Sequence, residues 1–315
     1  MLNPQLDRRG ELIHLLTTEG LPRRHVERLL DAARAWAAGE APAATPQPVF
    51  LSLPDDPACR DAYADAATRL SLLPVVLDAQ DAGSEPGDAL AQTVSGLAPG
   101  ILVLRHASSG AAHCAAAHAA PGLHVINAGD GQHADPLPAL ALVQAMQDIK
   151  QDLTNLAVTL VGDIRHSPVA RSVIHAMTTL GVPEVRAVAP RTLLPDSLPQ
   201  LGVRACASLQ EGLQDADVVI MLPLGVERIS GALLPSAREY AQAYGVTPAA
   251  LAAAKPDALV LPAGALTPGV EVDGDVAASL PPVEARLAGL LQYLRLAALG
   301  CLLYTSPSPR DQRGS

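Results

Sequence analysis

Short apolar runs alternate with longer amphipathic segments along this chain. Runs typical of buried strands are at residues 49–51, 75–77, 101–104, 124–126, 158–161, 185–188, 218–222 and 259–261. Segments that read as helices are at residues 24–37, 61–70, 89–97, 136–149, 169–180, 209–216, 235–243 and 282–300. Alternation of strands and helices favours parallel sheets with helices on both faces. We therefore expect an α/β protein built from doubly wound parallel sheets.

The alternation occurs in two sets, and the length of 315 residues also favours two domains. The expected division places one domain at residues 1–150 and a second at 151–281. Apolar residues make up 49% of the chain and aromatic residues only 2%, so the cores are built from Ala, Leu and Val. The end of the chain, residues 301–315, is polar and rich in Pro and Ser. It reads as a non-native tail and is excluded from the fold prediction.

Charge and cysteine usage narrow the classes of function. The net charge of −10 argues against nucleic acid as a partner, because a phosphate backbone requires a basic surface. The four cysteines are scattered without a C-x-x-C pair, which favours reduced thiols over zinc or disulfides. No apolar signal segment opens the chain, and no window approaches the roughly 20 apolar residues of a membrane span. We expect a cytoplasmic protein with no membrane partner.

One stretch is more specific than any composition argument: VGDIRHSPVARSVIHAMTTLGVPEV, residues 161–185. It reads as a strand, a Gly-Asp turn and a helix that Gly181 and Pro183 end. Further distinctive stretches are NPQLDRRGELIHLLTTEGLPRRHVERLLDAA (3–33), RHASSGAAH (105–113), HVINAGDG (124–131), ERISGALLPSAREY (227–240) and AKPDALV (254–260). In this order, these stretches resemble aspartate carbamoyltransferase, of the aspartate/ornithine carbamoyltransferase family.

The resemblance implies a fold and a chemistry. It implies two α/β domains, with the helix at 282–300 packing back on the first. It also implies an active site between neighbouring subunits of a trimer. The implied reaction transfers a carbamoyl group from carbamoyl phosphate to L-aspartate, giving N-carbamoyl-L-aspartate and phosphate, in pyrimidine biosynthesis. No cofactor and no metal are expected.

In the first domain, most positions that carry the family's chemistry hold other residues. The family's Ser-Thr-Arg-Thr-Arg phosphate-binding run falls on Asp56, Pro57, Ala58, Cys59 and Arg60. An Asp followed by Pro is an ordinary helix start, and a carboxylate there repels phosphate.

Three further positions of the first domain have changed. The lysine of the mobile loop is replaced by Pro86, and the family's His and Gln of a His-Pro-Thr-Gln motif are replaced by Asp135 and Pro138. His133 is expected to be a solvated loop histidine. Arg105 is the one clear survivor and, with Arg60, a remnant anion-binding residue; it is also able to pair with Asp56 or Asp135.

The second domain shows the same loss. The family's carboxylate-binding arginine falls on Pro168, and an Arg-x-Gln pair falls on Pro223 and Gly225. The family's His-Pro turn, whose carbonyls meet the substrate amine, falls on Pro262 and Ala263. Clamping and oxyanion-stabilising residues are each typically worth ~10²–10³ in rate, so the loss of most of them removes catalysis.

Three hypotheses remain open. The first is a catalytically degenerate homologue with a structural or regulatory role, which self-associates as a homotrimer or forms mixed oligomers with an active relative. The second is an active aspartate carbamoyltransferase, for which the surviving Arg105 is the best support. The third is a transferase or binding protein for a less anionic ligand.

Overall fold

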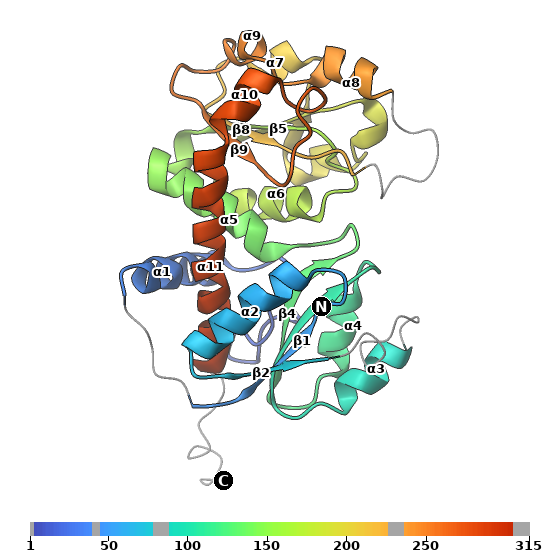
Figure 1. Ribbon diagram of the computed structural model, residues 1–315, viewed down its shortest axis with the longest axis vertical. Coiled ribbons are helices and arrows are strands. Elements are labelled where there is room, and N and C mark those ends of the chain that lie inside the picture. Colours follow the sequence, from blue (N-terminus) through green and yellow to red (C-terminus); the bar gives the residue numbers. More distant parts are fainter. Residues whose placement is uncertain (1–2, 40–44, 78–87, 226–235, 305–315) are drawn as a thin grey trace. The chain divides into compact units, whose positions relative to one another are not determined.

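The computed structural model has two parallel sheets, one of four strands and one of five, and each forms the core of one of two units (Figure 1). The structure describes residues 3–39, 45–77, 88–225 and 236–304. Unit 1 comprises residues 1–137 and 291–315, and unit 2 comprises residues 138–290. The doubly wound parallel α/β fold predicted from the sequence is confirmed. The predicted domain limits, 1–150 and 151–281, stay a prediction.

The sheet of unit 1 has the strand order β2-β1-β3-β4. Its strands are β1 (Pro48–Ser52), β2 (Leu73–Val76), β3 (Gly100–His106) and β4 (Leu123–Asp130). All three pairings are parallel, with Phe50 opposite Leu102 and Leu102 opposite Val125. The carboxyl ends of these strands therefore share one edge of the sheet, where side chains after β1, β3 and β4 come together.

Helices pack on both faces of this sheet. The helices of unit 1 are α1 (Arg23–Ala37), α2 (Pro57–Arg69), α3 (Asp88–Ser95), α4 (Ala111–His118) and the second half of α11 (Pro281–Tyr304). Leu90 and Val94 of α3 join Ala112 and Ala115 of α4 in a core over β1, β3 and β4. The helix α4 was not predicted, because its run of alanines carries no apolar periodicity.

The helices α1, α2 and the end of α11 form a second packed group. The Arg295 guanidinium of α11 lies 5.3 Å from the ring centre of Tyr63 on α2. Arg28 of α1 donates a 3.0 Å hydrogen bond to the carbonyl of Cys301. The helix thus includes residues 301–304, which the sequence analysis had assigned to the tail, and the buried Leu302 lies within it.

By length and composition, residues Pro281–Leu303 of α11 are able to span a membrane, with a mean hydropathy of 1.3 over the most apolar window. This differs from the expectation that no apolar stretch approaches that length. The same test is passed by core helices, and 44% of that window is buried in the structure. Burial in unit 1 explains the apolar residues of the last turns, from Leu294 to Leu302.

The sheet of unit 2 has the strand order β7-β6-β5-β8-β9, again parallel throughout. Its strands are β5 (Ala157–Val161), β6 (Glu184–Val188), β7 (Val203–Ala205), β8 (Val218–Met221) and β9 (Leu259–Pro262). The helices of this unit are α6 (Pro168–Leu180), α7 (Leu209–Leu213), α8 (Ala237–Tyr244), α9 (Pro248–Leu251) and α10 (Gly274–Ser279). Short 3-10 helices are η1 (Leu153–Asn155), η2 (Arg191–Leu193) and η3 (Leu198–Leu201), and α5 (Pro136–Lys150) begins in unit 1 and continues in unit 2.

Local sequence explains how α6 begins and ends. The Ser167 side chain accepts a 3.1 Å hydrogen bond from the Ala170 backbone, and Pro168 occupies the first turn. Gly181, with φ of 86°, ends the helix in the left-handed conformation that favours glycine. Pro168 therefore has a structural role as a helix start.

Candidate functional site

The candidate site of unit 1 lies at the carboxyl ends of β1, β3 and β4. Asp56 follows β1 and caps α2, accepting a 2.9 Å hydrogen bond from the Cys59 backbone. This agrees with the interpretation of Asp56 and Pro57 as a helix start. The helix N-terminus that would otherwise meet an anion is therefore occupied by a carboxylate of the chain itself.

Arg105, near the end of β3, is held by neighbours in unit 1. Its Nη1 lies 3.6 Å from Asp56 Oδ2 and donates a 3.0 Å hydrogen bond to the carbonyl of Ala128. Asp135 is close by: a Cβ atom added to Gly129 would lie 3.2 Å from Arg105 Nη1 and 3.4 Å from Asp135 Oδ2. Arg105 is thus paired with the carboxylate of Asp56 and has the carboxylate of Asp135 nearby, and both charges oppose the binding of an anion.

A second arginine, a thiol and a phenol complete this group. Arg295 Nη2 lies 3.8 Å from Cys59 Sγ. Burial raises the pKa of the Cys59 thiol, and the positive charge of Arg295 only partly opposes the shift. Burial likewise raises the pKa of Tyr63 well above its usual range. Both groups are therefore protonated near neutral pH, and neither is an activated nucleophile.

The remaining predicted positions lie outside this group. Arg60 on α2 is paired with the exposed Asp61, at 3.2 Å. Ala58 lies in the first turn of α2. Pro86 lies outside the described residues, and Pro138 is in α5 at the first residue of unit 2.

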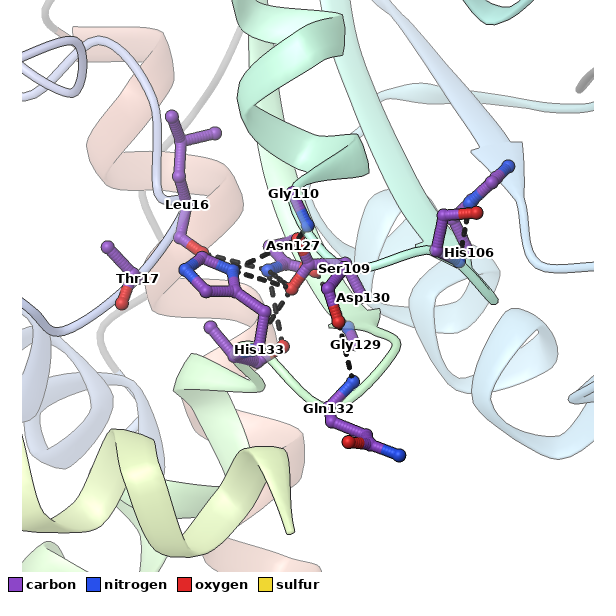
Figure 2. A network of polar contacts seen from close by, with 12 residues as sticks. Leu16, Thr17, His106, Ser109, Gly110, Asn127, Gly129, Asp130, Gln132 and His133 are labelled. Atoms are coloured by element: carbon purple, nitrogen blue, oxygen red, sulfur yellow. Dashed lines mark hydrogen bonds and ion pairs between the residues drawn. The ribbon is translucent and has the colours of Figure 1, made fainter. Parts of the chain in front are cut away.

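His133 is the clearest correction to the sequence analysis, which expected a solvated loop histidine. Its side chain is 21% exposed, and its Nδ1 lies 3.1 Å from both carboxylate oxygens of the fully buried Asp130 (Figure 2). The His113 ring packs edge-on against it, with ring centres 5.3 Å apart. Burial lowers the pKa of His113 and the charge of His133 lowers it further, against the opposing charges of Asp130 and Glu19.

Asp130 and His113 belong to this group but were not predicted from the sequence. Asp130 is the last residue of β4 and lies in the same strand-end motif as Asn127, HVINAGDG. Polar residues at the carboxyl end of a parallel strand are a usable signal. His113 lies on α4, a helix that was not predicted because of its run of alanines.

In unit 2, the predicted positions have structural roles. Pro168 starts α6, and Pro262 is the buried last residue of β9, followed by Ala263, whose backbone donates a 2.8 Å hydrogen bond to Met221. Pro223 and Gly225 flank Leu224, whose backbone N–H donates a 2.9 Å hydrogen bond to the side chain of the buried Glu271.

Two buried carboxylates lie near strand ends in unit 2: Asp163 follows β5, and Glu271 is bonded to the loop after β8. The buried Asp163 accepts hydrogen bonds from His166, whose Nδ1 lies 3.0 Å from both carboxylate oxygens. Burial raises the pKa of Tyr240, and the charges of Glu271 and Asp163 add to the shift. Arg165 points to the carbonyl of Leu194 and lies 3.9 Å from Asp196, and Arg171 is exposed on α6.

Solved structures show which fold this arrangement belongs to. The chain is similar to ornithine carbamoyltransferase from Thermus thermophilus, with 21% identity, 92% of this chain and 98% of that chain covered, and a TM-score of 0.74. It is 20% identical to ornithine carbamoyltransferase from Pyrococcus furiosus, with 93% of this chain and 97% of that chain covered and a TM-score of 0.75. It is 22% identical to aspartate transcarbamoylase from Trypanosoma cruzi in complex with phosphate, with 96% of this chain and 99% of that chain covered and a TM-score of 0.75. No protein-family model matches the sequence. The chain has the carbamoyltransferase fold.

Proposed function

We propose that this chain is a catalytically degenerate homologue of aspartate carbamoyltransferase that acts as a structural or regulatory subunit linked to pyrimidine biosynthesis. It works in the cytoplasm by self-association, as a homotrimer or in mixed oligomers with an active carbamoyltransferase. It uses no cofactor in this role.

The observation that carries the proposal is the environment of Arg105. Carbamoyl phosphate is an anion, and its transfer chemistry depends on positioning and on stabilisation of negative charge. Arg105 is engaged by Asp56, with Asp135 beside it. An anionic substrate would have to displace one carboxylate and remain next to the other, and both oppose its binding electrostatically.

Unit 2 supports the same conclusion independently. The positions of the family's aspartate-binding side chains hold Pro168, Pro223 and Gly225, none of which has a side-chain donor. Two buried carboxylates lie nearby, Asp163, which is bonded to the buried His166, and Glu271. These groups repel the carboxylates of an aspartate substrate.

An activity assay tests the proposal. Purified chain is supplied with carbamoyl phosphate and either L-aspartate or ornithine, with an Arg105→Ala variant as the control. We expect no carbamoylated product from either amine above the control. Formation of N-carbamoyl-L-aspartate that depends on Arg105 would overturn the proposal and favour the alternative of an active enzyme.

The other alternative is a transferase or binding protein for a less anionic ligand. The charge-balanced group of Arg105, Arg295, Asp56 and Asp135 favours it, since such a group is able to bind a neutral polar molecule. A thermal-shift screen with neutral and zwitterionic amides and amino acids separates this alternative from a purely structural role.

A further inference from the structure

We propose that His113, Asp130 and His133 form a binding site for a divalent late transition-metal ion, with Zn²⁺ as its representative. The site is separate from the group around Arg105 and does not depend on whether the chain transfers carbamoyl groups. No metal site was expected from the sequence.

Three segments of unit 1 converge at this point. His113 belongs to α4, Asp130 ends β4, and His133 lies in the turn that follows. One donor atom from each residue lies within 4.8 Å of the other two. Ligand atoms 2.0–2.2 Å from a tetrahedral zinc ion are ~3.4 Å apart, so the three donor atoms lie near this spacing and have to move closer to bind the ion.

Asp130 is held in place before any ion binds. It is fully buried and accepts hydrogen bonds of 2.8 Å from the Gly110 backbone, 2.9 Å from Asn127 Nδ2 and 3.0 Å from the Ala134 backbone. Figure 2 shows Gly110 and Asn127 beside the carboxylate of Asp130. A ligand whose carboxylate is fixed by neighbouring donors is typical of metal sites, where such contacts orient the ligands.

The pair of Asp130 and His133 has a spacing suitable for bridging by a metal ion. His133 Nδ1 lies 3.1 Å from either oxygen of Asp130, close to the ~3.4 Å between two ligands of a tetrahedral ion. The ion takes the place of the proton between the two atoms, and His133 then carries its proton on Nε2. His113 supplies the second nitrogen, and water completes the coordination.

The donor set selects the class of ion. Two imidazole nitrogens and one carboxylate oxygen suit Zn²⁺, Co²⁺ or Ni²⁺. Mg²⁺ and Ca²⁺ prefer oxygen ligands, which this site lacks in sufficient number. A bound ion would tie α4 to the turn between β4 and α5 and therefore stabilise unit 1.

The test uses the full chain without a histidine tag, after treatment with a chelator. Zn²⁺ is titrated by calorimetry, and Co²⁺ is followed by visible absorption, which reports imidazole coordination directly. We expect one Zn²⁺ per chain with micromolar affinity, and a melting temperature raised by ~2–5 °C in excess Zn²⁺. Mg²⁺ should give no saturable heat.

The variants His113→Ala and His133→Ala should each weaken Zn²⁺ binding by at least ~10-fold and remove the cobalt spectrum. The matched control is His118→Ala, on the same helix, where His118 Nδ1 lies 3.9 Å from Cys114 Sγ and offers the rival pair of ligands. It should bind Zn²⁺ as the parent chain does. Because Asp130 is buried and is bonded to the backbone, Asp130→Asn is informative only if its circular dichroism matches that of the parent.

Three outcomes would overturn the proposal. The first is unchanged Zn²⁺ affinity in both His113→Ala and His133→Ala. The second is a loss of binding confined to His118→Ala, which would place the ion on Cys114 and His118. The third is equal binding of Mg²⁺ and Zn²⁺.

Discussion

At the scale of single residues, the neighbours of a charged group decide what it is able to bind. Arg105 and Asp56 are each about one-third exposed, so their ion pair by itself stabilises the fold little. Its importance lies in occupying the arginine. Asp56 also caps α2, and this second role explains how the carboxylate is held in position facing Arg105.

The first prediction follows from that double role. The substitution Asp56→Ser removes the charge and keeps a side chain able to cap the helix, so stability should be unchanged within ~0.5 kcal/mol. Phosphate should then bind at least ~10-fold more tightly, because the freed Arg105 no longer has this carboxylate as a competitor. Phosphate titration by calorimetry measures the effect.

The exposed neighbour Asp55 provides the control for this experiment. Asp55→Ser removes the same charge one residue earlier without touching the cap or Arg105. If both variants bind phosphate equally well, the tighter binding comes from the change in net charge and not from the release of Arg105.

A second prediction concerns His14, which is buried beside His124 in unit 1. Burial lowers the pKa of His14 to about 4, and the charge of His124 adds to the shift. Its Nδ1 accepts a 3.0 Å hydrogen bond from the Val125 backbone, which requires the neutral ring. The stability that neutral His14 provides is fully present above pH 6.5 and is lost as the pH falls to about 4, at a total of ~3 kcal/mol.

Urea unfolding of the parent chain and His14→Asn at pH 7.5 and pH 4.5 measures this loss. The asparagine retains an acceptor for the Val125 backbone but does not titrate. The variant should therefore lose about 2–3 kcal/mol less than the parent between the two pH values. His118→Asn, at an exposed position, should behave like the parent, and an identical pH dependence in all three chains would contradict the assignment.

Residue-level sequence reasoning reached part of the candidate site. It identified Arg105, Asp56 and Asp135 together, because a strand end and a helix start are local patterns. It did not find His113 with His133, since that contact depends on how α4 packs beside the turn after β4. Contacts between side chains on different elements leave little trace in the sequence of either element.

At the scale of elements, backbone geometry is as specific as side-chain chemistry. Gly162 follows β5 with φ of 126°, and a Cβ there would meet the carbonyl oxygen of Leu222 at a separation shorter than any allowed contact. Strands β5 and β8 are neighbours in the sheet, so this close approach fixes how the two loops pass each other.

The third prediction is that Gly162→Ala destabilises the protein by at least ~3 kcal/mol, because strain and a backbone clash add together. Gly202→Ala is the control. Gly202 also has a positive φ, 72°, but a Cβ there meets no atom within 4 Å. Its cost should be only ~1 kcal/mol. Chemical denaturation compares the two, and equal losses would show that the contact with Leu222 is unimportant.

Most elements could be predicted from the sequence, because apolar periodicity survives wherever an element buries one face. The strands at 101–104, 158–161 and 185–188 and the helices at 136–149 and 169–180 are examples. The helix α4 was missed because an alanine run has no polar face to mark its period, and β7 was missed because it has only three residues. The end of α11 was missed because polar residues beyond 304 made the segment look like a tail.

At the scale of the whole molecule, one edge of a sheet is unusually apolar. β2 is one of the two outermost strands of the sheet in unit 1, and its residues are Leu73, Pro74, Val75 and Val76. Leu73 and Val76 are 58% and 54% exposed. Exposed apolar edge strands invite pairing with another chain, and soluble proteins usually protect them with charge.

The last prediction is therefore that the chain is oligomeric at micromolar concentration and that β2 contributes to the interface. Light scattering of the parent chain should give a mass well above the 32.5 kDa of one subunit. The double variant Leu73→Lys/Val76→Lys adds two charges to the strand and should shift the mass toward that of a monomer, since burying unpaired charges at an interface is costly.

Ile149→Lys, at an exposed apolar position on α5 in unit 2, should leave the mass unchanged. A monomeric parent would contradict self-association, and an oligomer unaffected by the double variant would place the interface elsewhere.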